Sequence, residues 1–258
     1  MRVSLYGTMG SIAGGYSDLG RNTTSVVIHN GDKDLIVDLG TGVLQHMIGN
    51  DDLEHHILLT HYHLDHILGF PFIPQLFSQD HTLHLYGLQS SDKSIAEELI
   101  GFMREPFLPM KREHILATIT SNPVVEKTRY MVNGFMVEAL HINHPGGVYV
   151  YAIQADGKKV VVLCDLPNGM ESNEELIAFC SKSDLIYVDA MFVESEFENV
   201  KLLQYGHSSV ESAIRLFRKT ASQKLVLGHH KISRQYDDLK HYETDDIVVG
   251  RDDMEFQL

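Results

Sequence analysis

Residues 54–66 of this chain read EHHILLTHYHLDH, a short apolar run that ends in a cluster of histidines and one aspartate. The length and apolar character of Ile57–Thr60 predict a buried strand, and the cluster begins directly after it. Side chains two residues apart in an extended segment share a side. The imidazoles of His61 and His63 can therefore converge on one metal ion.

Asp65 and His66 complete the cluster. They fall where we expect the chain to turn into a helix over Leu64–Phe70, and from there they can reach a second ion nearby. Metal-binding side chains this concentrated at the exit of a strand predict a two-metal site. The alternative interpretation is a histidine-rich surface turn.

Length and composition are those of an ordinary globular protein. With 258 residues and 43% hydrophobic residues, the chain can bury a large core. No linker or repeat stands out, so we expect a single domain over 1–258. The first residues read as a strand and not as a signal peptide, and Cys164 and Cys180 are too few for a disulfide framework. Both features favour a reducing, cytoplasmic location.

The net charge is −14, which argues against a large nucleic-acid footprint, because such a surface normally needs a basic face. No apolar run approaches the length of a membrane span. We therefore expect a small-molecule substrate, no extensive nucleic-acid surface and no membrane partner.

Strand and helix signals alternate along the chain. We expect strands at Val3–Tyr6, Ser25–His29, Leu35–Asp38, Ile57–Thr60, Leu83–Gly87, Phe135–His141, Val148–Gln154, Val160–Cys164, Asp184–Asp189 and Lys224–Leu227. We expect helices at Val43–Ile48, Leu64–Phe70, Ser90–Phe102, Glu174–Lys182 and Ser209–Thr220. Strands followed by alternating strands and helices predict an α/β fold with two packed sheets and helices outside, a four-layer αβ/βα sandwich.

Residues from about 90 to 130 are harder to interpret. Ser91 or Asp92 can cap the helix Ser90–Phe102, but Pro106, Pro109 and Pro123 then interrupt the periodicity among apolar side chains. We interpret this stretch as a lid or cap over a site. The alternative is an ordinary packed connection.

The cluster at 61–66 is followed by His144, Asp165 and His229-His230, and it is preceded by Asp38 in LIVDLGTG (35–42). In motif order and spacing, nearly the whole chain resembles the metallo-β-lactamase superfamily. The resemblance implies a di-metal hydrolase with two divalent ions, commonly Zn²⁺, with Mn²⁺ or Fe as alternatives. It also implies that water shared by the ions attacks the substrate, and homodimers are common among relatives.

Carried over residue by residue, the resemblance assigns the ligands. One ion would take His61, His63 and His144, and the other Asp65, His66 and His229, with Asp165 bridging; Asp65 also counts among the catalytic residues. Asp38 would orient a ligand imidazole or the cluster loop.

Three alternatives stay open within this assignment. His141 is the fallback for His144, because both lie near the end of one strand. The carboxylate of Asp165 could instead cap the turn that follows its strand. At Leu227-Gly228-His229-His230 the family pattern favours His229, and His230 is the alternative ligand.

Two substitutions argue against other branches of the superfamily. Asp165 stands where the secreted β-lactamases have a cysteine, while Cys164 should face the core by strand alternation. His63 stands where the diiron redox and oxygen-sensing relatives usually have a glutamate.

The element Gly206-His207-Ser208-Ser209 resembles the phosphodiesterase branch that includes tRNase Z and the PhnP-type enzymes. There the histidine lies beside the leaving group and an acidic residue steadies it, a place that Asp189 occupies here. An imidazolium supported by a carboxylate can protonate a departing alkoxide. The alternative is a helix N-terminal histidine satisfied by its own turn.

The opening stretches GTMGS (7–11) and RNTTS (21–25) also resemble that branch. Their backbone N–H groups could line a phosphate site, and a plain loop is the alternative.

We therefore predict a phosphodiesterase acting on a small phosphodiester or a cyclic nucleotide, with His207 as general acid. The alternatives are a thioester or lactone hydrolase of the glyoxalase II or lactonase type and, outside the hydrolases, a diiron redox or oxygen-sensing protein.

Overall fold

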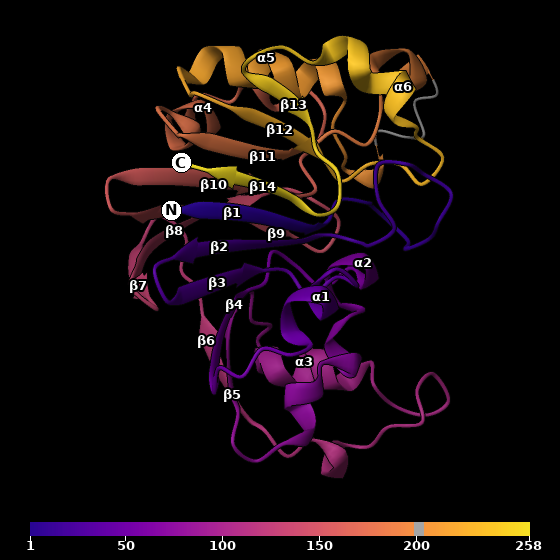
Figure 1. Cartoon of the computed structure of the whole chain (residues 1–258), viewed down its shortest axis with the longest axis vertical. Coiled ribbons are helices and arrows are strands. Elements are labelled where there is room, and N and C mark those ends of the chain that lie inside the picture. The colour runs from indigo at the N-terminus through magenta and orange to yellow at the C-terminus, as the bar shows by residue number, and fades with distance from the viewer. Residues whose placement is uncertain (199–203) are drawn as a thin grey trace.

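Two mixed sheets of seven strands lie face to face in the computed structural model, which describes residues 1–198 and 204–258 (Figure 1). The first sheet contains, in spatial order, β14 (Met254–Gln257), β1 (Arg2–Gly7), β2 (Ser25–Asn30), β3 (Lys33–Val37), β4 (Glu54–Leu58), β5 (Thr82–Gly87) and β6 (Thr118–Pro123). The second contains β13 (Ile247–Val249), β12 (Leu225–Gly228), β11 (Leu185–Asp189), β10 (Lys158–Leu163), β9 (Val148–Ala155), β8 (Phe135–Ile142) and β7 (Arg129–Val132).

Helices cover the outer face of each sheet, and Figure 1 shows one set at the top, above the second sheet, and the other beside β3, β4 and β5 in the lower half. The helices over the first sheet are α1 (Val43–Met47), α2 (Leu64–Ile67) and α3 (Ile95–Gly101). Those over the second are α4 (Glu174–Cys180), α5 (Val210–Thr220) and the short α6 (Tyr236–Leu239). The predicted four-layer αβ/βα sandwich is confirmed.

Strand alternation divides the apolar side chains among three cores. On β10, Val160 and Val162 point into the core between the sheets, while Val161 and Leu163 point into the core beneath α4 and α5. A third core lies between the first sheet and its helices. Because the central strands are covered on both faces, they read as continuous apolar runs.

Each sheet has a parallel half, and these halves position the polar residues. The strands β3, β4 and β5 are parallel to one another, and so are β10, β11 and β12. The carboxyl ends of parallel strands meet at one edge of a sheet. The residues that follow β4, β10, β11 and β12 are thereby brought together where the two sheets meet.

Some local predictions were wrong. Helix α3 begins after Ser94 and not at Ser90, because Ser94 and Glu97 form a capping box in which each accepts a backbone N–H of the other. Helix α2 ends at Ile67, and a 3-10 helix over Phe70–Phe72, which contains Pro71, follows it.

The stretch 90–130 is not one unit. Its last part forms β6 at the edge of the first sheet and the start of β7 at the edge of the second. Between α3 and β6 the chain contains a 3-10 helix at Arg112–His114. A lid role for this part stays a prediction.

Candidate metal centre and active site

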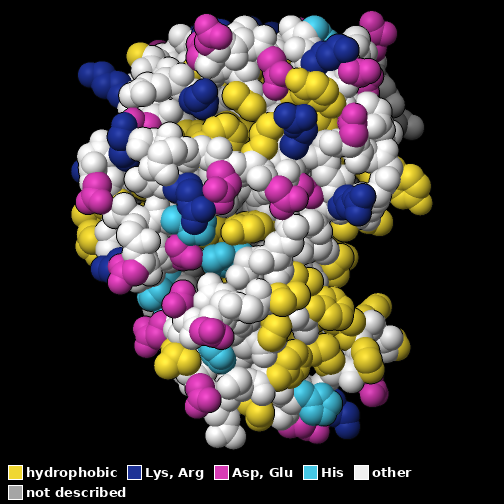
Figure 2. Space-filling model, in the orientation of Figure 1, with side chains coloured by type: hydrophobic (Ala, Val, Ile, Leu, Met, Phe, Trp, Pro, Cys, Tyr) yellow, Lys and Arg dark blue, Asp and Glu magenta, His cyan; other side chains and the backbone are white. Residues whose placement is uncertain are grey.

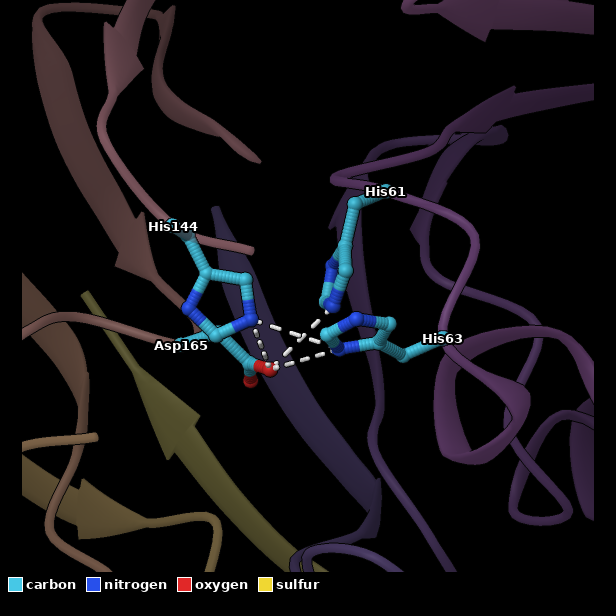
Figure 3. Close-up of side chains that lie close together, drawn as sticks. All are labelled: His61, His63, His144 and Asp165. Carbon is cyan, nitrogen blue, oxygen red and sulfur yellow. Dashed lines mark hydrogen bonds and ion pairs between the residues drawn. The ribbon is translucent and has the colours of Figure 1, made fainter. Parts of the chain in front are cut away.

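Three histidines converge on one oxygen of Asp165 (Figure 3). Asp165 Oδ2 lies 3.2 Å from His61 Nε2, 3.3 Å from His144 Nε2 and 3.8 Å from His63 Nδ1. His144 Nε2 and His63 Nδ1 are 3.3 Å apart. The four residues come from the loop after β4, the loop after β8 and the end of β10, so both sheets contribute to this group.

The other oxygen of Asp165 faces a second group. Asp165 Oδ1 lies 3.1 Å from His66 Nε2 and 3.0 Å from His229 Nε2. These two nitrogens are 3.2 Å apart, and Asp65 Oδ2 lies 3.1 Å from His229 Nε2. The structure thus brings together all seven residues predicted as ligands, with Asp165 between two sets of three.

The donor atoms fit metal ions. Two ligands about 2.1 Å from a tetrahedral ion stand about 3.4 Å from one another, close to the separations within each group. Moreover, both oxygens of Asp165 and His61 Nε2 are buried without a hydrogen-bond partner of good geometry among the described residues. Buried polar atoms are rarely left in this condition, and divalent cations would satisfy them.

Burial and charge divide the histidines into two kinds. Burial lowers the pKa of His61 and that of His144, the latter to about 4, so these rings are neutral near pH 7 as metal ligands must be. Burial alone would also lower the pKa of His229, but Asp165, Asp65 and Asp189 raise it to about 9. An ion bound by the second group would therefore replace a proton on His229.

Left-handed backbone turns place three of these side chains. Asp38, Asp165 and His229 have φ angles of 64°, 50° and 54°, which non-glycine residues adopt at a cost. Asp38 and His229 directly follow their strands, and Asp165 follows β10 after Cys164, which is buried in the core between the sheets. Asp165 and His229, from the second sheet, thereby lie beside His66, which follows a strand of the first sheet, while Asp38 contacts His66 and Thr60 within its own sheet.

Asp38 lies behind the cluster. Its Oδ2 lies 2.7 Å from His66 Nδ1, and its Oδ1 accepts the backbone N–H of Thr60 at 2.8 Å. With a proton on His66 Nδ1, Nε2 is free to bind an ion. This geometry suits the predicted orienting role.

The stretch 7–11 lies against the site. The backbone N–H of Ser11 donates to Asp65 Oδ2 at 2.7 Å, which fixes that carboxylate. A Cβ on Gly10 would come within 2.5 Å of His229 Nδ1 and within 2.6 Å of Met191 Cε, so only glycine fits beneath the His229 ring. Neither contact could be assigned from the sequence, where the stretch reads equally well as a loop.

The alternative ligands lie elsewhere. His230 Nε2 is 2.8 Å from the carbonyl oxygen of Gly250 and points away from Asp165 into the fold. His141 is exposed and its ring lies edge-on to that of Tyr149. His229 and His144 therefore occupy the places beside Asp165.

His207 and Asp189 form a pair beside the second group. His207 Nδ1 lies 2.8 Å from Asp189 Oδ2, and its ring stacks on that of His229 with centroids 5.0 Å apart. The N–H of Phe192 donates to the Ser208 carbonyl, which holds the loop before α5 against the loop after β11.

Sequence reasoning missed one support of this loop. Asn168 Oδ1 accepts both the N–H and the hydroxyl of Ser209, the residue that caps α5. A lone asparagine in a turn carries no signal of that role.

Residues 38–230, well over half of the chain, match the family model described as a beta-lactamase superfamily domain. The chain belongs to the metallo-β-lactamase superfamily. Its predicted resemblance to the phosphodiesterase-like branch of that superfamily is confirmed by the relatives described next.

Three similar proteins illustrate this superfamily relationship. Ribonuclease Z of Pyrococcus furiosus is 22% identical, over 81% of this chain and 80% of its own. The metallo-β-lactamase fold protein YhfI of Bacillus subtilis superposes with a TM-score of 0.75 at 20% identity, covering 99% of this chain and 98% of its own. Human tRNase Z, short form, superposes with a TM-score of 0.71 at 16% identity, and the match covers 100% of this chain and 99% of the tRNase Z chain.

These comparisons confirm the prediction of a metal-dependent hydrolase and contradict the predicted partners. Relatives named ribonuclease Z and tRNase Z conflict with a small-molecule substrate and with no nucleic-acid surface. A net charge of −14 is a sum over the whole chain and does not exclude a local basic surface. On the face in Figure 2, most Lys and Arg side chains lie over the upper half, interspersed with Asp and Glu. No helix within 1–198 or 204–258 is long and apolar enough to cross a membrane.

Proposed function

We propose that this protein is a metal-dependent phosphodiesterase that hydrolyses a phosphodiester bond in RNA. The observation that carries the proposal is the His207–Asp189 pair, which stacks on His229 at the edge of the metal-ligand groups. It supplies a proton donor where a leaving group would depart. The names of the relatives support RNA as the substrate class.

The ligand sets follow from the two oxygens of Asp165. His61, His63 and His144 would hold one ion, and Asp65, His66 and His229 the other, with Asp165 shared. Imidazole and carboxylate ligands suit Zn²⁺, and also Mn²⁺ or Fe. When bound, such ions neutralise charge on phosphoryl oxygens and make water acidic enough to act as a nucleophile near neutral pH.

His207 holds and delivers a proton. Because Nδ1 faces the carboxylate of Asp189, the imidazolium carries its second proton on Nε2. From Nε2 the proton can pass to the oxygen that leaves phosphorus, which otherwise departs as a poor, strongly basic alkoxide. Asp189 stabilises the imidazolium and fixes the ring, and its own Oδ1 accepts the N–H of Met191 at 3.0 Å.

Acyl hydrolysis is the competing activity. A thioester releases a weakly basic thiolate that leaves without a proton. Thioester hydrolysis would therefore not require the pair of His207 and Asp189. The diiron alternative is disfavoured because His63 stands where those relatives usually have a glutamate.

The test is hydrolysis by metal-loaded protein of labelled RNAs, including tRNA transcripts, compared with a thioester panel. We expect RNA cleavage that His207→Ala slows about 10²- to 10⁴-fold and that His141→Ala, at an exposed histidine outside the site, leaves intact. Turnover of thioesters without cleavage of any RNA would overturn the proposal.

A further inference from the structure

A separate cluster, made of side-chain types that can bind a metal ion, lies near the start of strands β4 and β5, away from Asp165. Figure 2 shows histidines at the surface over the first sheet. His56 on β4 stands directly across from His84 on β5 in the parallel register. Glu54, two residues before His56, shares its face of the sheet because side chains alternate along a strand.

The donor atoms of these three residues are close together. Glu54 Oε2 lies 3.4 Å from His84 Nε2, and one ligand atom from each residue lies within 4.8 Å of the other two. The rings of His56 and His84 are stacked, with centroids 4.6 Å apart and planes 15° from parallel.

Neighbouring hydroxyls determine which ring nitrogens are free. His84 Nδ1 lies 3.0 Å from Thr120 Oγ1 on β6, and His56 Nδ1 lies 3.4 Å from the Tyr86 hydroxyl. Contacts of this kind through one nitrogen orient histidines that bind metals through the other. His84 Nε2 is in fact buried and has no hydrogen-bond partner of good geometry among the described residues.

We propose that Glu54, His56 and His84 bind a divalent transition-metal ion of the Zn²⁺ class, separately from the site at Asp165. Two imidazoles and one carboxylate are a donor set that Zn²⁺ accepts, with water in the fourth position.

Both rings can adjust to a shared ion. To share an ion, the two stacked rings have to tilt toward one another. The partial exposure of both side chains leaves space for this movement.

The test counts ions. Wild type, His84→Ala and Glu54→Gln are dialysed against the same buffered free Zn²⁺, and bound zinc per chain is measured after circular dichroism verifies folding. His81→Ala is the matched control, because His81 stacks on His55 on the opposite face of the same strands. We expect His84→Ala to bind one ion fewer than wild type, Glu54→Gln to need at least tenfold more free Zn²⁺ for that ion, and His81→Ala to match wild type.

A second readout separates this site from the proposed catalytic one. Titrating Zn²⁺ into wild type should shift the ring ¹⁵N resonances of His56 and His84, while His84→Ala should keep wild-type hydrolysis. Equal zinc contents in wild type and His84→Ala would overturn the proposal and leave Glu54 and His84 as an ordinary ion pair. Loss of hydrolysis together with the ion would also overturn it, because the ion would then belong to the site at Asp165.

Discussion

Asp38 Oδ2 lies 2.7 Å from His66 Nδ1, and both side chains are completely buried. The contact joins the end of β3 to helix α2 and determines which nitrogen of His66 faces Asp165. In Asp38→Asn an amide N–H can face the ring N–H, so the ring loses its acceptor. We expect metal affinity to fall about 10- to 100-fold, measured by competition with a chromogenic chelator.

Asp184→Asn is the control for Asp38→Asn. Asp184 is a buried carboxylate directly before β11, at the opposite end of that strand from Asp189, and it accepts a hydrogen bond from Lys158 Nζ at 2.9 Å. The substitution Asp184→Asn should lower the thermal stability of the protein without changing its metal affinity. Equal metal affinity in Asp38→Asn and wild type would contradict the orienting role.

His229 and His230 are adjacent in sequence but should respond differently to substitution. His229→Ala should lose the ion held with Asp65 and His66. His230→Ala should keep both ions of the proposed catalytic site and lose about 1–3 kcal/mol of unfolding free energy, because the carbonyl of Gly250 is left without its partner. Metal analysis and chemical denaturation of both variants distinguish the two roles. If His230→Ala were the variant that loses metal, the assignment would be reversed.

Gly10 should tolerate no larger residue. In Gly10→Ala the added methyl would lie 2.5 Å from His229 Nδ1, so the ring or the loop has to move. We expect an unfolding free energy lower by about 1–3 kcal/mol and weaker metal binding. Gly15→Ala, at a glycine with nothing within 4 Å of the added Cβ, is the matched control. Similar metal affinities in the two variants would show that this contact does not position His229.

Much of the fold and of the candidate ligand set follows from local sequence pattern. The strand before His61 and the run Val160–Cys164 are apolar and predict buried strands. Polar side chains directly after such strands are therefore expected at the edge of the sheet. The period of two along a strand predicts that His61 and His63 lie on one side, and it places Cys164 in the core.

Other features depend on contacts that sequence cannot show. The turn after β12, where His229 takes a φ of 54°, places His229 and not His230 beside Asp165. The strand β6 was missed because its residues are mostly polar and it ends at Pro123, yet it pairs with β5 at the edge of the sheet. The contact of Ser11 with Asp65 joins residues 54 positions apart through a backbone N–H, which no side-chain pattern encodes.

Removing metal should destabilise the fold. Bound ions neutralise the buried carboxylates around Asp165, so they bind the folded chain more tightly than the unfolded one. At free metal about 100-fold above the dissociation constant, the gain is about 2.7 kcal/mol. We expect a chelator to lower the melting temperature of wild type in differential scanning calorimetry.

His63→Ala should respond less to the chelator. Its side chain is 44% exposed, so its removal costs a ligand and little packing. A melting temperature of wild type that is the same with and without chelator would contradict the ligand assignment.

The loss of activity in His207→Ala should depend on the basicity of the leaving group. If Nε2 of His207 protonates the departing oxygen, His207→Ala should lose about 10²- to 10⁴-fold in kcat on RNA, whose leaving group is an alkoxide. The same variant should lose much less on bis(p-nitrophenyl) phosphate, because p-nitrophenolate departs without a proton. Asp189→Asn should show the same dependence with a smaller loss, since the ring stays but its imidazolium is less stabilised. Both variants should keep their metal. An equal loss on both substrates would assign His207 to ligand or substrate positioning instead of proton transfer.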